Sequence, residues 1–202
     1  MLKEQEDIIL KVKDLYIKYG IKSVSMDDVA RECGISKKTL YQYFKDKEEL
    51  VEKVFQFLID ANKSVVDNML NQNLDAITEM FEIHLFMDDM ARRHSHVVEY
   101  DLKKYYPHVF EQIIDVRRQR IYDIGISNMK KGLKEGYYRP EINIEIIVKL
   151  ALLRFESSID TCIFTNEELL SQDFFKELFI YHIRGIGTAK GISKMESLLK
   201  TQ

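Results

Sequence analysis

Residues 20–50 read GIKSVSMDDVARECGISKKTLYQYFKDKEEL, and this stretch begins two short helices in quick succession. Ser25 and Asp28 have the spacing of a capping box, in which each side chain accepts a hydrogen bond from the other residue's backbone amide. Ser36 has a side chain preferred at a second helix start. Gly34 lies between the two starts, and glycine readily adopts the left-handed conformation that turns a chain at a helix end. The stretch therefore predicts a helix, a tight turn and a second helix.

The apolar residues of this stretch predict two helix faces that pack together. They are Met26, Val29, Ala30 and Cys33 on the first helix, Ile35 in the turn, and Leu40, Tyr43 and Phe44 on the second helix. Ala30 is small where the second helix must cross closely, and Cys33 is expected to be a small buried residue. A small residue, a glycine four positions later and apolar residues on both sides of the turn form the pattern of a helix-turn-helix.

The second helix has an outward face rich in hydrogen-bonding groups: Lys37, Lys38, Thr39, Tyr41 and Gln42. Lysine donates to guanine, glutamine pairs with adenine through two hydrogen bonds, and the threonine methyl group contacts thymine, so this face suits the major groove of DNA. Tyr41, Lys47 and the backbone amides at the Ser25 and Ser36 helix starts suit phosphate contacts, which position a protein without specifying sequence. We predict a DNA-binding surface here.

The charge distribution agrees with a local affinity for nucleic acid rather than a general one. The formal net charge is −3, whereas the segment from Arg31 to Lys47 holds five basic residues against two acidic ones. A focused basic patch on a mildly acidic body is typical of a site-specific DNA-binding protein. The charges alone are equally compatible with an ordinary solvated, lysine-rich face.

The rest of the chain has helical spacing of apolar residues almost throughout. We predict a first helix ending at Gly20, a long helix from about Lys47 behind the capping pair Asp46 and Glu49, and helices at about 74–91, 95–105, 108–134, 144–163 and 167–189. Two prolines, eight glycines and no convincing alternating pattern favour an all-α fold. The expected punctuation comprises Pro107 at a helix start, Gly132 and Gly136 at a helix end, and Asn143 and Asn166 as N-caps.

The sequence indicates no leader, membrane span, disulfide or metal site. Charges of both signs occur within the first seven residues, and no apolar run approaches the roughly 18 residues of a membrane-spanning helix. Cys33 and Cys162 lie far apart, which suits a reducing cytoplasm. His94 and His96 are two residues apart and do not share a helix face, so they make a poor metal site. We expect a cytoplasmic protein without cofactor or metal.

Residues 8–50 resemble the N-terminal domain of the TetR/AcrR family of transcriptional regulators. The resemblance lies in IIxxVxxLY at 8–16, Gly20, MDDVA at 26–30, GIS at 34–36, and KKTLYQYF followed by KDKEEL at 37–50. It implies an all-helical two-domain fold, a homodimer, and usually repression that a small ligand relieves. Family DNA contacts correspond here to Ser25, Ser36, Lys37, Lys38, Thr39, Tyr41, Tyr43 and Lys47. Cys33 and Lys38 depart from the family, in which alanine and a small residue are frequent at these positions.

We predict a helix-turn-helix DNA-binding domain at residues 1–47 and a larger helical sensing and dimerisation domain at 48–202. Residues 146–153 leave almost no polar face, so this helix must be covered on most sides. The last predicted helix carries the apolar residues Phe174, Phe175, Leu178, Phe179, Ile183 and Ile186. Pairing of helices 144–163 and 167–189 with their symmetry mates would form a two-fold dimer interface, and one enlarged monomer core is the alternative.

The site for an effector is the least defined part of the sequence. Candidate lining residues recur at helical steps or could face one another: Met80, Phe81, His84, Met87, Tyr122 and Phe155. Stripes of methionine and aromatic residues more often form core. If a cavity exists, its apolar lining with His84 or Tyr122 as a polar anchor suggests a small hydrophobic or aromatic ligand.

Two other classes of protein stand as alternatives: a helical enzyme that binds a small molecule, and a helical interaction module without sequence-specific DNA binding. The sequence contains no GxSxG, P-loop, HExxH or EF-hand loop that would support an enzyme. The basic residues Lys37, Lys38 and Lys47 argue against loss of DNA binding. We therefore expect a ligand-responsive repressor that binds a palindromic operator as a homodimer, and no enzymatic activity.

Overall fold

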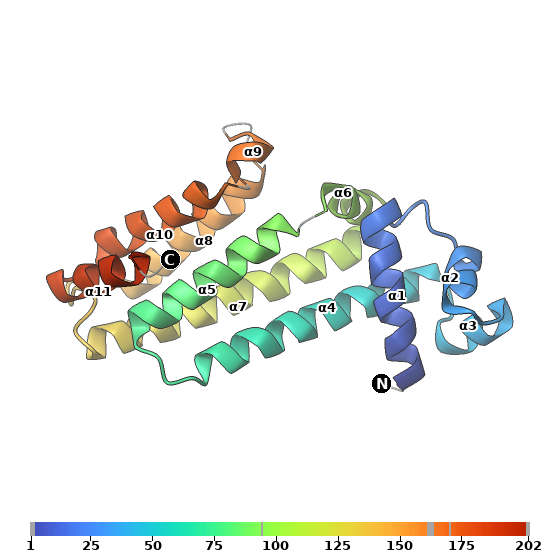
Figure 1. Ribbon diagram of the computed structural model, residues 1–202, viewed down its shortest axis with the longest axis horizontal. Coiled ribbons are helices and arrows are strands. Elements are labelled where there is room, and N and C mark those ends of the chain that lie inside the picture. The colour runs from blue at the N-terminus through green and yellow to red at the C-terminus, as the bar shows by residue number, and fades with distance from the viewer. Residues whose placement is uncertain (1–2, 94, 161–163, 170, 201–202) are drawn as a thin grey trace. The chain divides into compact units, whose positions relative to one another are not determined.

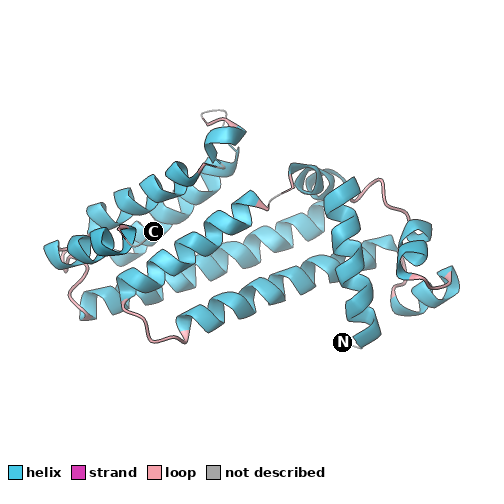
Figure 2. Ribbon diagram, viewed as in Figure 1, coloured by secondary structure: helices cyan, strands magenta, loops and turns pink. Residues whose placement is uncertain are grey.

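The computed structural model describes residues 3–93, 95–160, 164–169 and 171–200. Within these ranges the chain is helical apart from short connections, and its β-type pairing is limited to an isolated bridge between Tyr138 and Gly187 (Figure 2). The predicted all-α class is confirmed. No helix in the described ranges is both long and apolar enough to span a membrane.

The helices follow one another along the chain as labelled in Figure 1. Their bounds are α1 Lys3–Tyr19, α2 Met26–Cys33, α3 Lys37–Tyr43, α4 Lys47–Leu70, α5 Ala76–Arg92, α6 His96–Tyr105, α7 Pro107–Lys134, α8 Ile144–Asp160, α9 Asn166–Leu169, α10 Gln172–Ile186 and α11 Ala189–Leu199. The predicted helices up to residue 160 correspond to α1 and α4 to α8, with α2 and α3 forming the predicted pair. The end of the predicted helix 144–163 and the second cysteine, Cys162, lie outside the described residues.

The prediction of one helix over 167–189 is wrong. The segment contains nearly all of α9 and the whole of α10, and α11 begins at its last residue, Ala189. Ser171 caps α10 by accepting from the Phe174 amide at 3.2 Å, and Thr188 caps α11 by accepting from the Gly191 amide at 3.2 Å. The apolar periodicity continues across these caps, which is why the pattern alone suggested a single helix.

Most of the predicted helix starts and helix ends are present. Pro107 is the first residue of α7, and the Asn143 side chain accepts from the Ile146 amide at 3.1 Å at the start of α8. Asn166 was the wrong cap for α9, because the Thr165 hydroxyl accepts from the Glu168 amide at 3.2 Å one residue earlier. Gly136 follows α7 with a left-handed φ of 75°.

The chain forms two compact units, residues 1–65 with 95–116 and residues 66–94 with 117–202, which we call the head unit and the C-terminal unit. The two unit boundaries that interrupt helices fall inside α4 and α7. These are units of packing, and the division of function at residues 47 and 48 stays a prediction. The head unit has a core drawn chiefly from α1 to α4, whereas the core of the C-terminal unit is drawn from α5, α7, α8, α10 and α11.

The C-terminal unit contains a buried polar network between α5 and α7. Glu79 is 4% exposed and accepts from the Asn128 amide group at 2.8 Å and from the Lys131 ammonium at 2.7 Å. The buried Tyr138 hydroxyl donates to the Asn128 carbonyl oxygen at 2.7 Å. Gly132 lies inside α7 against the Tyr138 ring, which leaves no room for a Cβ atom. These contacts fix the register of the two helices.

Candidate nucleic-acid interface

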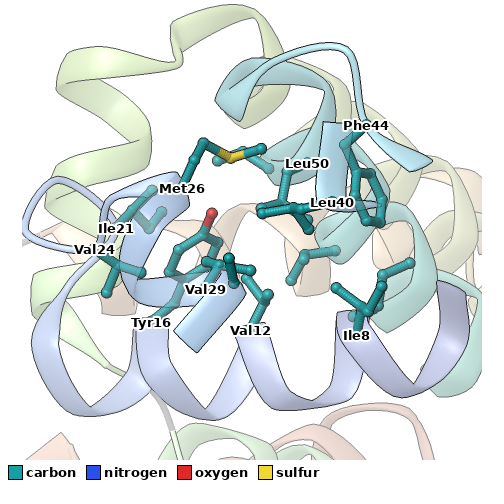
Figure 3. Packing of buried hydrophobic residues seen from close by; sticks show 14 of the residues in the cluster. Ile8, Val12, Tyr16, Ile21, Val24, Met26, Val29, Leu40, Phe44 and Leu50 are labelled. Atoms are coloured by element: carbon teal, nitrogen blue, oxygen red, sulfur yellow. The ribbon is translucent and has the colours of Figure 1, made fainter. Parts of the chain in front are cut away.

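The helix-turn-helix is held by a hydrophobic core beneath α2 and α3 (Figure 3). Leu40 and Phe44 are fully buried on the inner side of α3, and Val29 and Ala30 are buried on α2. The residues of α1 that complete this core are Ile8, Ile9, Val12 and Tyr16. Burying one face of α3 in this way turns its opposite face to solvent. Cys33 is half-buried rather than buried as predicted, because it lies at the margin of the core.

The start and end of α2 are fixed by the residues that the sequence indicated. The Ser25 hydroxyl accepts from the Asp28 amide at 3.2 Å, and the Asp28 carboxylate accepts from the Ser25 amide at 3.0 Å. Hydrogen bonds from the Ser25 side chain and backbone lower the pKa of Asp28. Gly34 has a φ of 68°, in the left-handed region, and its amide bonds back to α2. The predicted capping box and turn are both present.

The start of α3 uses Ser36 as its cap. The Ser36 hydroxyl accepts from the Thr39 amide at 3.0 Å and lies 2.8 Å from the Thr39 hydroxyl. Thr39 is half-buried, and its hydroxyl is engaged within the turn. Ser25 and Ser36 thus order the backbone at the two helix starts.

The outward face of α3 presents the predicted base-contacting and phosphate-contacting groups. Lys37, Lys38 and Gln42 are exposed, and Tyr41 is 44% exposed. The Lys37 ammonium is 2.8 Å from the Asp27 carboxylate of α2, and this hydrogen bond raises the pKa of Lys37. Because both partners are exposed, the ion pair is weak.

Tyr43 and Lys47 lie at the edge of this face and are partly engaged by the protein. The Tyr43 hydroxyl donates to the Glu4 carboxylate of α1 at 2.5 Å, which raises the pKa of Tyr43. The Lys47 ammonium donates to the Lys22 carbonyl at 3.2 Å, and partial burial lowers the pKa of Lys47. Each contact restrains the orientation of its side chain.

A contact that the sequence did not suggest holds the segment between α1 and α2. Asp101 of α6 is 6% exposed and accepts from the Lys22 amide at 2.8 Å. The Lys22 ammonium donates to the Tyr105 hydroxyl at 2.8 Å and lies over the Tyr105 ring. Gly20 has a φ of 80° and packs against Asp101, so a side chain there would crowd the carboxylate. Since 79 residues separate Lys22 from Asp101, no local pattern could reveal this contact.

The predicted effector residues lie in the C-terminal unit with different degrees of burial. Phe81 is buried, whereas Met80, His84, Met87 and Tyr122 are half-buried. The Phe81 ring packs on Phe179, with 5.2 Å between centroids. The side chain of Phe155 lies outside the described residues.

A separate groove of about 350 Å³ lies in the head unit, lined by residues of α4 and α7. Its apolar lining consists of Phe55, Ile59, Val109, Ile113 and Val116. It contains none of the predicted effector residues. Among the described residues, no group of three or more histidine, cysteine or acidic side chains could hold a metal ion.

Comparison with known proteins agrees with this geometry. Residues 9–54 match the model of the family described as bacterial regulatory proteins, tetR family. The HTH-type transcriptional repressor KstR2 of Mycolicibacterium smegmatis is 23% identical over 152 residues, which cover 72% of this chain and 72% of the relative. The HTH-type regulator YfiR of Bacillus subtilis is 22% identical over 178 residues, covering 82% and 83% of the two chains.

Solved structures share the fold over nearly the whole chain. A transcriptional regulator from Cytophaga hutchinsonii superposes with a TM-score of 0.72 at 22% identity, covering 91% of this chain and 98% of that one. CprB of Streptomyces coelicolor, solved in complex with its biological operator sequence, superposes with a TM-score of 0.65 at 14% identity, covering 97% and 94%.

A capped helix pair with a left-handed glycine turn, packed on a third helix and matched by named regulators, defines a helix-turn-helix transcriptional regulator. Within that class, residues 9–54 match the DNA-binding domain of the tetR family of bacterial regulatory proteins.

Proposed function

We propose that the protein is a ligand-responsive repressor that binds a palindromic operator as a homodimer and leaves it when a small hydrophobic effector binds. The observation that carries the proposal is the outward face of α3, where Lys37, Lys38 and Gln42 are exposed, while Leu40 on the opposite side of the helix and Phe44 just after it are fully buried. The relative KstR2 is named a transcriptional repressor, and CprB was solved on operator DNA. A protein that represses transcription from operator DNA acts in the cytoplasm, and operator binding requires no enzymatic activity.

We assign two kinds of DNA contact to the named residues. Lys37, Lys38, Thr39 and Gln42 contact base edges in the major groove, since they lie on the outward side of α3 or beside it. The residues assigned to phosphates are Ser25, Ser36, Tyr41, Tyr43 and Lys47, with the two serines acting through the helix starts that they cap. The base contacts specify the operator, and the phosphate contacts set the register.

We assign the dimer interface to the solvent-facing apolar side of α8 together with α10. Ile146, Leu150 and Leu153 recur along one side of α8 and are 55%, 49% and 59% exposed, and Tyr181 of α10 is 71% exposed. Such an apolar stripe is self-complementary across a two-fold axis. The residues of α10 that we first expected at this interface, Phe179, Ile183 and Ile186, instead pack inside the C-terminal unit.

Dimerisation links the DNA contacts to regulation. Two linked helix-turn-helix units gain effective concentration at the second half-site, so a change in their separation weakens binding without altering either unit. We assign the effector site to the C-terminal unit, around Met80, Phe81, His84, Met87, Tyr122 and Phe155. An apolar ligand there would act on the spacing rather than on α3.

The direct test is a gel shift with the intergenic DNA that flanks the gene. We expect a saturable shift that survives competitor DNA, and absence of any shift at low salt would contradict the proposal. Gln42→Ala should relax the preference for one base pair of the operator by about 1–3 kcal/mol. Tyr41→Phe should instead lower the affinity for all DNA sequences alike. The opposite pattern would reverse the two assignments.

The dimer is tested by sedimentation of a variant with a charge in the apolar stripe. Leu150→Glu should shift the protein to a monomer and weaken operator binding, because an unpaired carboxylate would be buried at the interface. The exposed Glu145 of α8 offers a matched control, since Glu145→Lys changes charge outside the stripe. A Leu150→Glu protein that remains dimeric would place the interface elsewhere.

A further inference from the structure

A cluster of nitrogen-bearing side chains lies where α5, α8 and α10 of the C-terminal unit meet. Arg154 of α8 donates from its guanidinium to Nδ1 of His182 on α10, at 3.0 Å. His84 of α5 places Nε2 in hydrogen-bonding contact with the Phe175 carbonyl. The three side chains are half-buried, come from three helices and share one neighbourhood.

Both imidazoles of this cluster are held neutral. Burial and the neighbouring Arg154 charge lower the pKa of His182 to about 4, and His84 acts in the same direction. Burial also lowers the pKa of His84, and this effect exceeds the opposite effects of the hydrogen bond to the Phe175 carbonyl and of the Asp88 charge. Asp88 is itself paired with Arg92 at 3.1 Å, and the Arg154 guanidinium lies over the Tyr181 ring. The cluster therefore combines a guanidinium with two imidazoles that can each take up a proton.

The chemistry of the cluster suits an anion and not a cation. The Nδ1 lone pair of His182 already accepts from Arg154, and the guanidinium charge opposes a metal ion at the imidazoles. A carboxylate would instead accept from the guanidinium, and its charge would favour protonation of His182 at Nδ1, which then gives up the hydrogen bond from Arg154 and donates to the carboxylate. It matches both components of the cluster.

The surroundings of the cluster are aromatic. His84 packs against the rings of Phe175 and Phe179, with centroid distances of 5.9 Å and 5.3 Å, and Phe81 packs on Phe179. A molecule with its charged end at Arg154 would thus have its body among apolar rings.

We infer that the effector is an organic acid with an apolar or aromatic body, and that Arg154 and His182, with His84 beside them, recognise its carboxylate. The inference rests on the proposed effector site in the C-terminal unit and adds the chemical class of the ligand. His84 had been predicted as a polar anchor, whereas Arg154 and His182 become neighbours of it only in the folded chain.

The test is calorimetric titration of the full-length protein with two matched sets of probes. One set is octanoate, 1-octanol and octylamine, and the other is 4-phenylbutyrate, 4-phenyl-1-butanol and 4-phenylbutylamine. At least one acid should bind about tenfold or more tightly than its alcohol and its amine. Repeating the titration at pH 6 in buffers of different ionisation enthalpy should show uptake of about one proton per acid bound. The same acid should reverse the operator gel shift.

Arg154→Gln should lower the affinity for the acid by about tenfold or more, whereas the affinity for the alcohol should stay within about twofold of the wild-type value. Arg184→Gln is the matched control, since Arg184 is an exposed arginine of α10 paired with Glu196 at 3.7 Å. If Arg154→Gln loses its fold by circular dichroism, His182→Asn serves as the second variant, and it should weaken acid binding and lower the proton uptake, with only His84 left to take up a proton.

The outcomes separate this inference from the proposed function. Equal binding of acid and alcohol, tighter binding of the amine, or no binding of either acid at millimolar concentration would overturn the acid specificity. Acid binding that depends on Arg154 in a protein that shifts no operator DNA would support the acid site and contradict the repressor.

Discussion

The head unit and the C-terminal unit each contain a buried carboxylate, and the two are held in different ways. Asp101 in the head unit accepts a hydrogen bond from the Lys22 backbone amide. Glu79 in the C-terminal unit accepts from two side chains, Asn128 and Lys131. One carboxylate fixes the backbone just before the helix-turn-helix, whereas the other joins two long helices. The head unit is thus braced for a fixed geometry of its DNA-binding surface.

The cores of the two units also differ in their content of polar and titratable side chains. The head core is formed almost entirely by apolar side chains, and the described histidines of this unit, His96 and His108, are exposed. The C-terminal unit has the Glu79 network and two inward-facing imidazoles, His84 and His182. Groups that respond to protons or to ligand charge are therefore concentrated in the unit to which we assign sensing.

The largest effect should come from removing the buried carboxylate of the C-terminal unit. Glu79→Leu should lower the free energy of unfolding by about 3 kcal/mol, because Lys131 and Asn128 lose a charged partner inside the protein. Urea denaturation followed by circular dichroism measures the change. Glu177→Leu on the exposed side of α10 should change it by less than about 0.5 kcal/mol. A loss below about 1 kcal/mol for Glu79→Leu would mean that the network contributes little.

Acid should destabilise the C-terminal unit before carboxylates titrate. The pKa of His182 is about 4 in the folded protein, below the ordinary value of 6.5, so the unfolded chain takes up the proton first. This contribution is present above pH 6.5 and falls with pH, by about 2 kcal/mol at pH 5. Denaturation of the wild type and His182→Asn from pH 7.5 to 5 should show a flatter profile for the variant. Parallel profiles would show that His182 is not the titrating group.

The carboxylate of the head unit allows a test that distinguishes its acceptor role from its charge. Asp101→Ala should cost about 1.5 kcal/mol, because the Lys22 amide loses its acceptor, and it should also weaken operator binding. Asp101→Asn retains an acceptor oxygen and should lie close to the wild type in both measurements. If the asparagine variant is as impaired as the alanine variant, the charge matters more than the hydrogen bond.

The smallest effect concerns two glycines, one in each unit. Gly34→Ala should cost about 1 kcal/mol, because an L side chain is strained at a φ of 68° even though open space surrounds it. Gly185→Ala in α10 also meets open space but has a helical backbone, so it should stabilise the protein by up to about 1 kcal/mol. Thermal unfolding of the two variants measures both shifts. If the two substitutions changed the stability in the same direction, the backbone conformation at the glycine would not be what decides the effect.

Much of the geometry of the helix-turn-helix could be predicted because its determinants are local. The Ser25 and Ser36 caps and the Gly34 turn act over three or four residues, and burial of Leu40 and Phe44 follows from helical spacing. The prediction failed where local signals compete. Apolar periodicity through 167–189 concealed the caps at Ser171 and Thr188, so α9 and α10 were expected as one helix and the start of α11 was missed.

The sequence by itself determined the all-α class, the helix-turn-helix and the set of side chains on the outward face of α3. Each of these features depends on hydrogen bonds and residue spacings within a few residues of the chain. Such local interactions form whatever the surrounding tertiary structure is. Only the tertiary structure decided that Asp101 braces Lys22, that Glu4 binds Tyr43, and that Arg154 meets His182. These contacts join groups between 28 and 79 residues apart, and they form only because packing of the apolar faces brings distant helices together.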